Sequence, residues 1–191
     1  ALISLGAFPH FVDSEVDCLG IDLVKLEKYF NKKFIKKGQK YFNRITNKPL
    51  SGMICTHIFG NTNNVDKLKK FCRKKKIFLI EDSSEALGSR FKNKSLGTFG
   101  DMGLLSFNGN KIITSGGGGA LITNDKRIYI KTKHLSQNAK IQHMWEYNYN
   151  DLGYNIGMPN LNASLGFSQI LKLNKNIKKK KSVYEYYKKE F

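Results

Sequence analysis

The chain has 191 residues, 40% of them hydrophobic, which is enough for one domain with a buried core. It contains no apolar run of about eighteen residues and no basic and apolar leader at its N-terminus, so neither a transmembrane helix nor a signal peptide is predicted. Its 3 cysteines fit neither a disulfide framework nor a CxxC metal site, and we therefore expect no metal and a reducing, cytoplasmic location.

The formal net charge is +18, which could indicate a surface for nucleic acid or for an anionic membrane. Only Arg44, Arg73, Arg90 and Arg127 are arginines, and arginine is the side chain best suited to bidentate contacts with phosphates and bases. The lysines are spread among many asparagines. We therefore expect a solvated basic surface that accepts anionic, nucleotide-linked substrates, and no nucleic-acid or membrane partner.

In chain order, residues 8–13 predict a short strand, with a proline near its start where a missing N–H matters least. Residues 22–30 predict an amphipathic helix with Asp22 as its N-cap. Residues 32–48 are basic and lack a clear period, which indicates a surface hairpin or loop without assigned function.

Residues 51–60 predict a buried strand that runs into a glycine turn, and residues 65–75 predict a helix that Asn64 can cap. A second apolar strand, residues 77–81, follows at once. Strand, helix and strand at this spacing favour a parallel βαβ unit, whose functional groups are expected at the carboxyl ends of the strands. His57 and Asp82 both fall near such ends.

The remaining elements follow the same logic. Residues 90–95 predict a hairpin with Asn93 in the turn. Two further apolar runs, residues 103–107 and 118–123, predict strands, and residues 125–135 predict a helix. A single last helix is predicted to start at Asn160 or Asn162 and to become rich in lysine toward its end.

An acid and an amine stand at the ends of two predicted strands. Asp82 could bind a metal, act as a base or only cap the next helix. Lys111 would ordinarily be presumed exposed, but Ile112, Ile113 and small residues flank it, which suggests an amine partly removed from water that could form a Schiff base. Together they fit a pyridoxal-phosphate site, because the cofactor ring acts as an electron sink only while a neighbouring carboxylate keeps its nitrogen protonated.

The glycine run 116–119 does not match GxxxxGK[ST], so a P-loop nucleotide site is disfavoured. Glycine here is better explained by tight turns and by close approach of the backbone to a ligand. Ser106 and Asn108 lie beside Lys111, where they could make ordinary hydrogen bonds at the strand end or bind the cofactor phosphate.

These residues occur within motifs that closely resemble the DegT/DnrJ/EryC1/StrS family of pyridoxal-phosphate sugar aminotransferases, over nearly the whole chain. The form of the segment around Lys111 and the glutamate at position 85 are most similar to the branch that aminates precursors of nonulosonic acids of the legionaminic type. The matching motifs are FVD at 11–13, HIFG at 57–60, EDSSEALGS at 81–89, GTFGD at 97–101, SFNGNK at 106–111, the glycine run, GYN at 153–155 and PNLNA at 159–163.

The resemblance implies an α/β fold: the three-layer large domain of an aspartate aminotransferase-like, fold type I transferase, with a mostly parallel sheet that is incomplete here. Residues 1–165 would form part of this domain, and residues 166–191 would begin the helix that leads to a small C-terminal domain. Both ends look cut, so the chain is expected to correspond to about the central half of the family's length. A Gly-Thr helix start that cradles the phosphate in relatives is absent from it.

The resemblance also implies roles for individual residues. Lys111 would form the internal aldimine and carry protons, Asp82 would hold the pyridinium proton, and Ser106 would contact the phosphate. Glu85 stands where many relatives carry Gln or His near the cofactor's phenolic oxygen. Asn155 would reach the cofactor of a partner subunit, which implies a homodimer with shared active sites.

The expected function is transfer of an amino group, with glutamate as the expected donor, to a keto carbon of a nucleotide-linked sugar for polysaccharides such as lipopolysaccharide. A related sugar dehydratase is disfavoured, because dehydratases of this family replace the lysine by histidine. The alternative is a non-catalytic relative that dimerises or binds ligand without turnover. Gly157 and the ends that look cut motivate it. Relatives usually carry an aromatic residue and then an arginine where this chain has Ile156 and Gly157, and that arginine is associated with the substrate.

Overall fold

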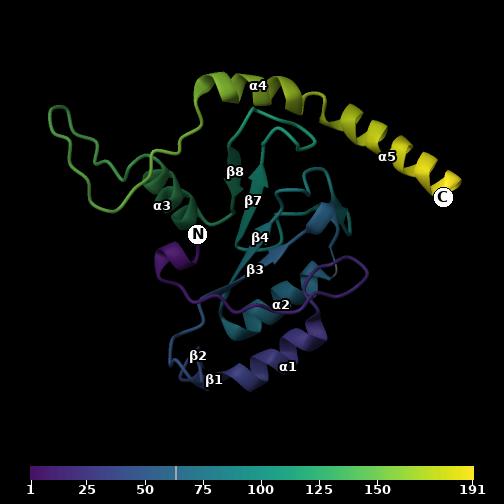
Figure 1. The fold of residues 1–191 in the computed structure, drawn as a ribbon. Coiled ribbons are helices and arrows are strands. Elements are labelled where there is room, and N and C mark those ends of the chain that lie inside the picture. Colours follow the sequence, from purple (N-terminus) through teal and green to yellow (C-terminus); the bar gives the residue numbers. More distant parts are fainter. Residues whose placement is uncertain (63) are drawn as a thin grey trace.

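The computed structural model describes residues 1–62 and 64–191 as an α/β molecule built on one four-stranded sheet (Figure 1). The strand order is β3-β4-β7-β8. Strands β3, β4 and β7 are parallel, while β8 runs antiparallel to β7, so the predicted mostly parallel sheet is confirmed. Their bounds are Gly52–Thr56 for β3, Phe78–Asp82 for β4, Met102–Ser106 for β7 and Gly119–Ile122 for β8.

Helix α2, Val65–Lys75, connects β3 to β4 and completes the predicted parallel βαβ unit. Val65, Leu68 and Cys72 recur at helical spacing and form its buried face. Leu68 and Cys72 pack in the main core cluster, and Val65 packs in a second cluster with Ala86, Leu96 and Phe99. Asn64 occupies the N-cap position as predicted, but its side chain accepts no capping hydrogen bond. The buried members of the main core cluster are Leu26, Cys55, Leu68, Cys72, Ile77 and Leu79.

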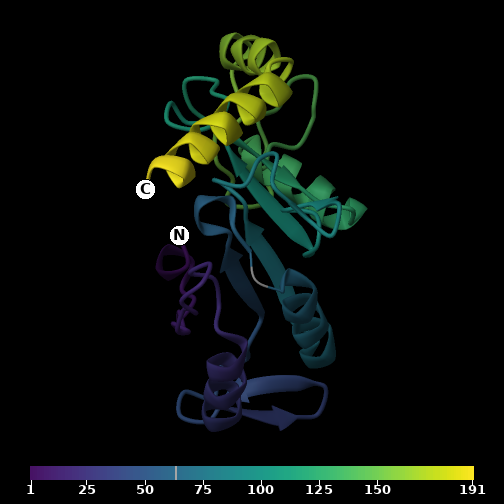
Figure 2. The same cartoon turned by 90° about the vertical axis from the view of Figure 1, so that its right-hand side faces the viewer.

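The N-terminal part of the chain places residues 23–43 at the end of the sheet away from the C-terminal helices, residues 160–190 (Figure 2). It contains a short 3-10 helix, Ile3–Leu5, then α1, Leu23–Lys33, and the hairpin of β1, Phe34–Lys37, and β2, Lys40–Asn43. The predicted N-cap is confirmed, since Asp22 Oδ1 accepts the N–H groups of Val24 at 2.9 Å and Lys25 at 3.0 Å. The hairpin predicted as one option for the basic segment is confirmed as well.

The strand predicted at residues 8–13 is wrong. Among the described residues no strand pairs along this segment. Pairing is limited to its end, where Asp22 N donates to Asp13 O, and to the isolated bridge between Ser14 and Ile21 that follows. Phe8 and Phe11 are exposed there. The apolar pattern of a strand did not decide the structure because no neighbouring strand supplies a ladder of hydrogen bonds.

The hairpin predicted at residues 90–95 is confirmed. Strands β5, Arg90–Phe91, and β6, Lys94–Ser95, pair antiparallel. The two residues between them, Lys92 and Asn93, both have positive φ, 48° and 62°, as a two-residue type I′ turn requires.

The helix predicted at residues 125–135 is confirmed as α3, Lys126–Ser136, which begins after the N-cap Asp125. Residues 137–159 then form an arm that extends from the sheet before the chain returns to α4, Asn160–Ile170 (Figure 1). The chain ends in α5, Leu173–Glu190. No helix in the described part of the chain is long and apolar enough to cross a membrane.

The single last helix that the sequence predicted is wrong, because the chain breaks between α4 and α5 at residues 171–172. The break lets both helices contact the same loop beside the sheet. Asn162 of α4 donates its side-chain amide to Ser115 O at 2.6 Å, and Asn176 of α5 donates to Ile112 O at 3.1 Å. These tertiary contacts replace the continuous helix that local propensity favours.

Candidate functional site

The carboxyl ends of the three parallel strands meet at one edge of the sheet. In the ladder Asp82 stands beside Thr56 of β3 and Leu104 of β7. Two further backbone bonds extend the edge, from His57 N to Asp82 O at 3.0 Å and from Ser83 N to Leu104 O at 2.9 Å. This register places the groups that follow each strand side by side, as the βαβ topology predicts.

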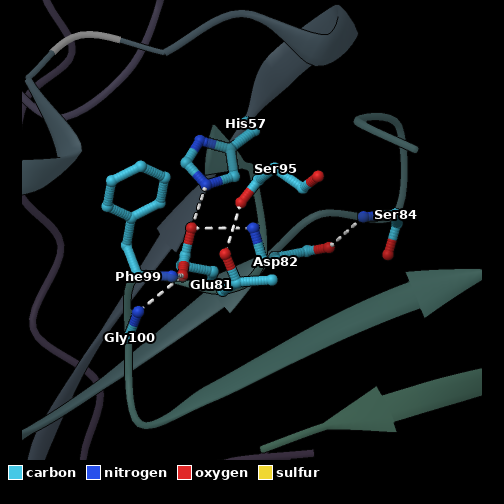
Figure 3. Close-up of polar contacts among 9 residues, drawn as sticks. His57, Glu81, Asp82, Ser84, Ser95, Phe99 and Gly100 are labelled. Carbon is cyan, nitrogen blue, oxygen red and sulfur yellow. Dashed lines mark hydrogen bonds and ion pairs between the residues drawn. The ribbon is translucent and has the colours of Figure 1, made fainter. Parts of the chain in front are cut away.

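Asp82 ends β4, and no helix follows it directly, so it does not act as the helix cap that was one interpretation of the sequence. Its Oδ1 accepts the N–H of Ser84 at 3.1 Å (Figure 3). Within the described part of the chain, its Oδ2 has no hydrogen-bond partner. One carboxylate oxygen thus fixes the side chain, while the other remains available to a ligand.

Lys111 lies in the loop after β7 and meets Glu85 from the loop after β4. Its Nζ is 3.4 Å from Glu85 Oε1, and its side chain is only 16% exposed, in agreement with an amine partly removed from water. Glu85 is held from the other side, because its Oε2 accepts the N–H of Phe59 at 2.9 Å. The bond from Phe59 and the ammonium of Lys111 hold the pKa of Glu85 below its usual value, although the nearby charge of Asp82 opposes this.

Ser106 and Asn108 occupy the turn between β7 and Lys111. Ser106 Oγ is 3.4 Å from the N–H of Asn108, and Asn108 O accepts the N–H of Lys111 at 3.1 Å. The sequence allowed two interpretations of these residues, ordinary hydrogen bonds at the strand end or binding of the cofactor phosphate. The contacts observed are hydrogen bonds of the first kind. They make the backbone of the lysine loop part of a defined turn.

The glycine run is explained in part by the protein's own backbone. Gly116 and Gly118 have φ of +78° and +83°, values that side chains other than glycine adopt rarely. A Cβ on Gly119 would lie 2.3 Å from Leu105 O, so β8 could not pair so closely with β7. The tight turns that the sequence predicted are therefore present.

Asn155 is not brought to this edge. It forms an isolated bridge with Gln137 at the base of the arm, and it makes no hydrogen bond with Asp82, Glu85 or Lys111 in the described structure. Five of the six predicted site residues thus lie at or next to the sheet edge, and Asn155 lies elsewhere.

Sequence reasoning missed the environment of Glu81. This residue was noted only as part of a strand end, but its side chain is fully buried and is bonded to the imidazole of His57 (Figure 3). The available signal was strand alternation, since Leu79 and Glu81 face the same side of the sheet and both are buried.

The arrangement at the edge can be tested against a pyridine cofactor with a reactive carbonyl. Such a group needs a carboxylate for its ring nitrogen and an amine for its carbonyl carbon. Asp82 has a free oxygen and Lys111 supplies a shielded amine. The loop that follows Asp82 brings Glu85 within 3.4 Å of Lys111 Nζ, so the acid and the amine belong to one locality. The residues present fit this group.

Two surface hollows of about 340 and 560 Å³ lie near the N-terminal segment, and neither is lined by Asp82 or Lys111. The first is lined by Phe11, Val12, Asp13, Lys25 and Tyr29.

Comparisons with known proteins identify the family of the chain. The sequence model of the DegT/DnrJ/EryC1/StrS aminotransferase family matches residues 1–191. GDP-perosamine synthase of Escherichia coli O157:H7 is 33% identical over 184 residues, which is 96% of this chain and 46% of the relative. The Campylobacter jejuni (strain 81-176) UDP-4-amino-4,6-dideoxy-N-acetyl-beta-L-altrosamine transaminase is 35% identical over 133 residues, 69% of this chain and 35% of the relative.

Among solved structures, Helicobacter pylori PseC, an aminotransferase involved in the biosynthesis of pseudoaminic acid, superposes with a TM-score of 0.75 at 26% identity. The likeness covers 90% of this chain and 42% of that one. The chain therefore spans about half the length of the relatives it matches. The predicted α/β fold of a pyridoxal-phosphate transferase is confirmed.

Proposed function

Because the chain belongs to the DegT/DnrJ/EryC1/StrS aminotransferase family, whose cofactor is pyridoxal 5′-phosphate, we propose that it serves in transferring an amino group to a keto carbon of a nucleotide-linked sugar. The names of the two curated relatives support the substrate class, since one makes a GDP-linked and the other a UDP-linked amino sugar. The observation that carries the proposal is the gathering of Asp82, Glu85 and Lys111 at one sheet edge.

When bound, the cofactor supplies an electron sink for the electrons released as a C–H bond of the amino donor breaks. Lys111 would hold the cofactor through its Nζ and move a proton between carbon atoms. The free Oδ2 of Asp82 would keep a proton at the ring nitrogen, because a carboxylate favours the charged form of a neighbouring base.

The other site residues would orient the cofactor. Ser106 and Asn108 would contact its phosphate from the turn before Lys111, and Glu85 would lie near its phenolic oxygen. The fixed bond from Phe59 to Glu85 supports this role, since it prevents the carboxylate from rotating freely.

We also propose finer features that the sequence indicated. Glutamate would be the donor, the sugar would belong to the nonulosonate type, and residues 166–191 would begin the link to a small domain.

The protein would act in the cytoplasm as a homodimer in which Asn155 reaches the partner's cofactor. Exposed Met144 and Trp145 on the arm support a second copy; sedimentation as a monomer at micromolar concentration would contradict it.

Covalent labelling tests the central proposal. The purified protein is loaded with pyridoxal 5′-phosphate and reduced with borohydride, and the labelled peptide is identified by mass spectrometry. We expect the label on Lys111, loss of the visible cofactor band in Lys111→Ala, and an intact band in the control Lys126→Ala, which alters an exposed lysine of α3.

A label on another lysine, or an unchanged band in Lys111→Ala, would contradict the assigned role. Turnover is then measured with a panel of nucleotide-linked keto-sugars. A protein that binds the cofactor through Lys111 but aminates none of them would instead match the non-catalytic relative.

A further inference from the structure

A fully buried carboxylate lies directly behind the proposed cofactor edge. Glu81 is 0% exposed and accepts hydrogen bonds at both oxygens (Figure 3). Its Oε1 accepts the N–H groups of Phe99 and Gly100, each at 2.6 Å. Its Oε2 accepts His57 Nε2 at 2.9 Å and the N–H of Gly97 at 2.9 Å.

Glu81 and its donors lie on three parts of the chain that carry the site. His57 follows β3, and its own N–H is bonded to Asp82 O. Glu81 immediately precedes Asp82 on β4. The loop of residues 97–100 leads into β7, which in turn leads to Ser106 and Lys111. One carboxylate therefore ties together the elements that present the acid and the amine.

The contacts are strong enough to serve this purpose. Burial by itself raises the pKa of Glu81, but the hydrogen bonds from His57 and from the Gly100 and Gly97 amides outweigh it, so the pKa lies below its ordinary value. A buried carboxylate that loses one of its donors retains the full cost of its desolvation.

The loop is also fitted closely to β4. A Cβ on Gly100 would lie 2.5 Å from Leu79 O, and Gly97 has a φ of +86°. The close approach leaves no room for this loop to move toward β4. Because the loop continues directly into β7, its position also affects the strand that leads to the lysine loop.

We propose that His57 and Glu81 are positioning residues for the cofactor edge. Their hydrogen bond locks the loop of residues 97–100 to the ends of β3 and β4 and so fixes where Lys111 stands relative to Asp82. The inference rests on the proposed function for its effect on the cofactor, while the locking of the loop can be observed without cofactor.

The test compares His57→Leu, which removes the donor, with His57→Gln, whose side-chain amide can still donate to Glu81. Leu68→Ala is the control for lost stability, because it removes core packing of α2 without touching the carboxylate. Glu81 itself is left unchanged, since a single amide oxygen could not replace both carboxylate oxygens and the variant could fail to fold.

Two readouts separate positioning from general stability. In the cofactor-free protein, amide hydrogen exchange of residues 97–100 should accelerate at least about tenfold in His57→Leu and remain near wild type in His57→Gln and Leu68→Ala. In the loaded protein, the dissociation constant for pyridoxal 5′-phosphate should rise about tenfold or more in His57→Leu, and His57→Gln should restore most of the affinity.

Unchanged exchange in His57→Leu would overturn the inference even if the cofactor did not bind. Equal losses of affinity in His57→Leu and Leu68→Ala at matched Tm would also overturn it, because the pair would then act only through stability. A different outcome would separate the two proposals. If amide exchange of residues 97–100 accelerates in His57→Leu but the wild-type protein shows no cofactor band, the proposed function would be contradicted and the positioning of the loop by His57 and Glu81 would still be supported.

Discussion

At the scale of single residues, the site depends on the balance of two acids around one amine. Glu85 is 39% exposed and held by the Phe59 amide, while Lys111 is largely covered. Asp82 uses only one of its oxygens within the described protein. The two acids therefore differ in their availability to a ligand. Glu85 already contacts the amine of Lys111, whereas the second oxygen of Asp82 can accept a hydrogen bond from a protonated ring nitrogen.

Asp82→Asn separates the structural role of this side chain from its charge. The amide oxygen can still accept the Ser84 N–H, so we expect Tm to change little. It cannot stabilise a protonated ring nitrogen, so kcat/KM for amino transfer should fall by about 10²–10⁴-fold. Steady-state kinetics and thermal unfolding measure the two effects; a fall in activity that only parallels a fall in Tm would contradict this role.

At the scale of elements, the local sequence determines where a helix begins or a turn forms when the stabilising contacts come from neighbouring residues. Asp22 caps α1, Asp125 caps α3 through the N–H of Arg127, and Lys92-Asn93 form the turn between β5 and β6. Such elements depend on contacts within a few residues. The sequence therefore predicted their positions closely.

Asp22→Ala tests this at α1. The change removes an acceptor from the N–H groups of Val24 and Lys25, and we expect a loss of about 1 kcal/mol in the free energy of unfolding. Asp22→Asn retains an oxygen in the same place and should lose much less. Urea unfolding of both variants measures the difference, and equal losses would show that the cap bond is not the cause.

At the scale of the whole molecule, the large excess of positive charge makes the acids important for stability. The chain carries +18 at neutral pH. Several carboxylates are held below their usual pKa, among them Glu81 in the core, and Asp125, which the Arg127 side chain and amide lower to about 2. Protonating these groups both breaks their contacts and increases repulsion.

Stability should therefore fall with acidification. A carboxyl whose folded pKa is depressed stabilises the protein above its unfolded pKa, here near 4.5 for Glu81, and loses that contribution as the pH falls through the lower folded value. We expect Tm to be nearly level from pH 7 to about 5 and to decrease steadily below it. Thermal unfolding across this range measures it; a Tm that rises on acidification would contradict the assignment.

The sequence by itself determined the βαβ unit, the cap at Asp22, the helix after residue 125, and the acid and amine at strand ends, because each depends on periodicity or on neighbouring residues. The roles of the site residues, which it could only suggest, stay predictions. Tertiary structure alone decided that residues 8–13 lack a strand partner and that the last helix breaks over the loop of Ile112 and Ser115. It also decided that Glu81 collects donors from residues up to 24 positions away, since contacts between distant segments leave no local pattern.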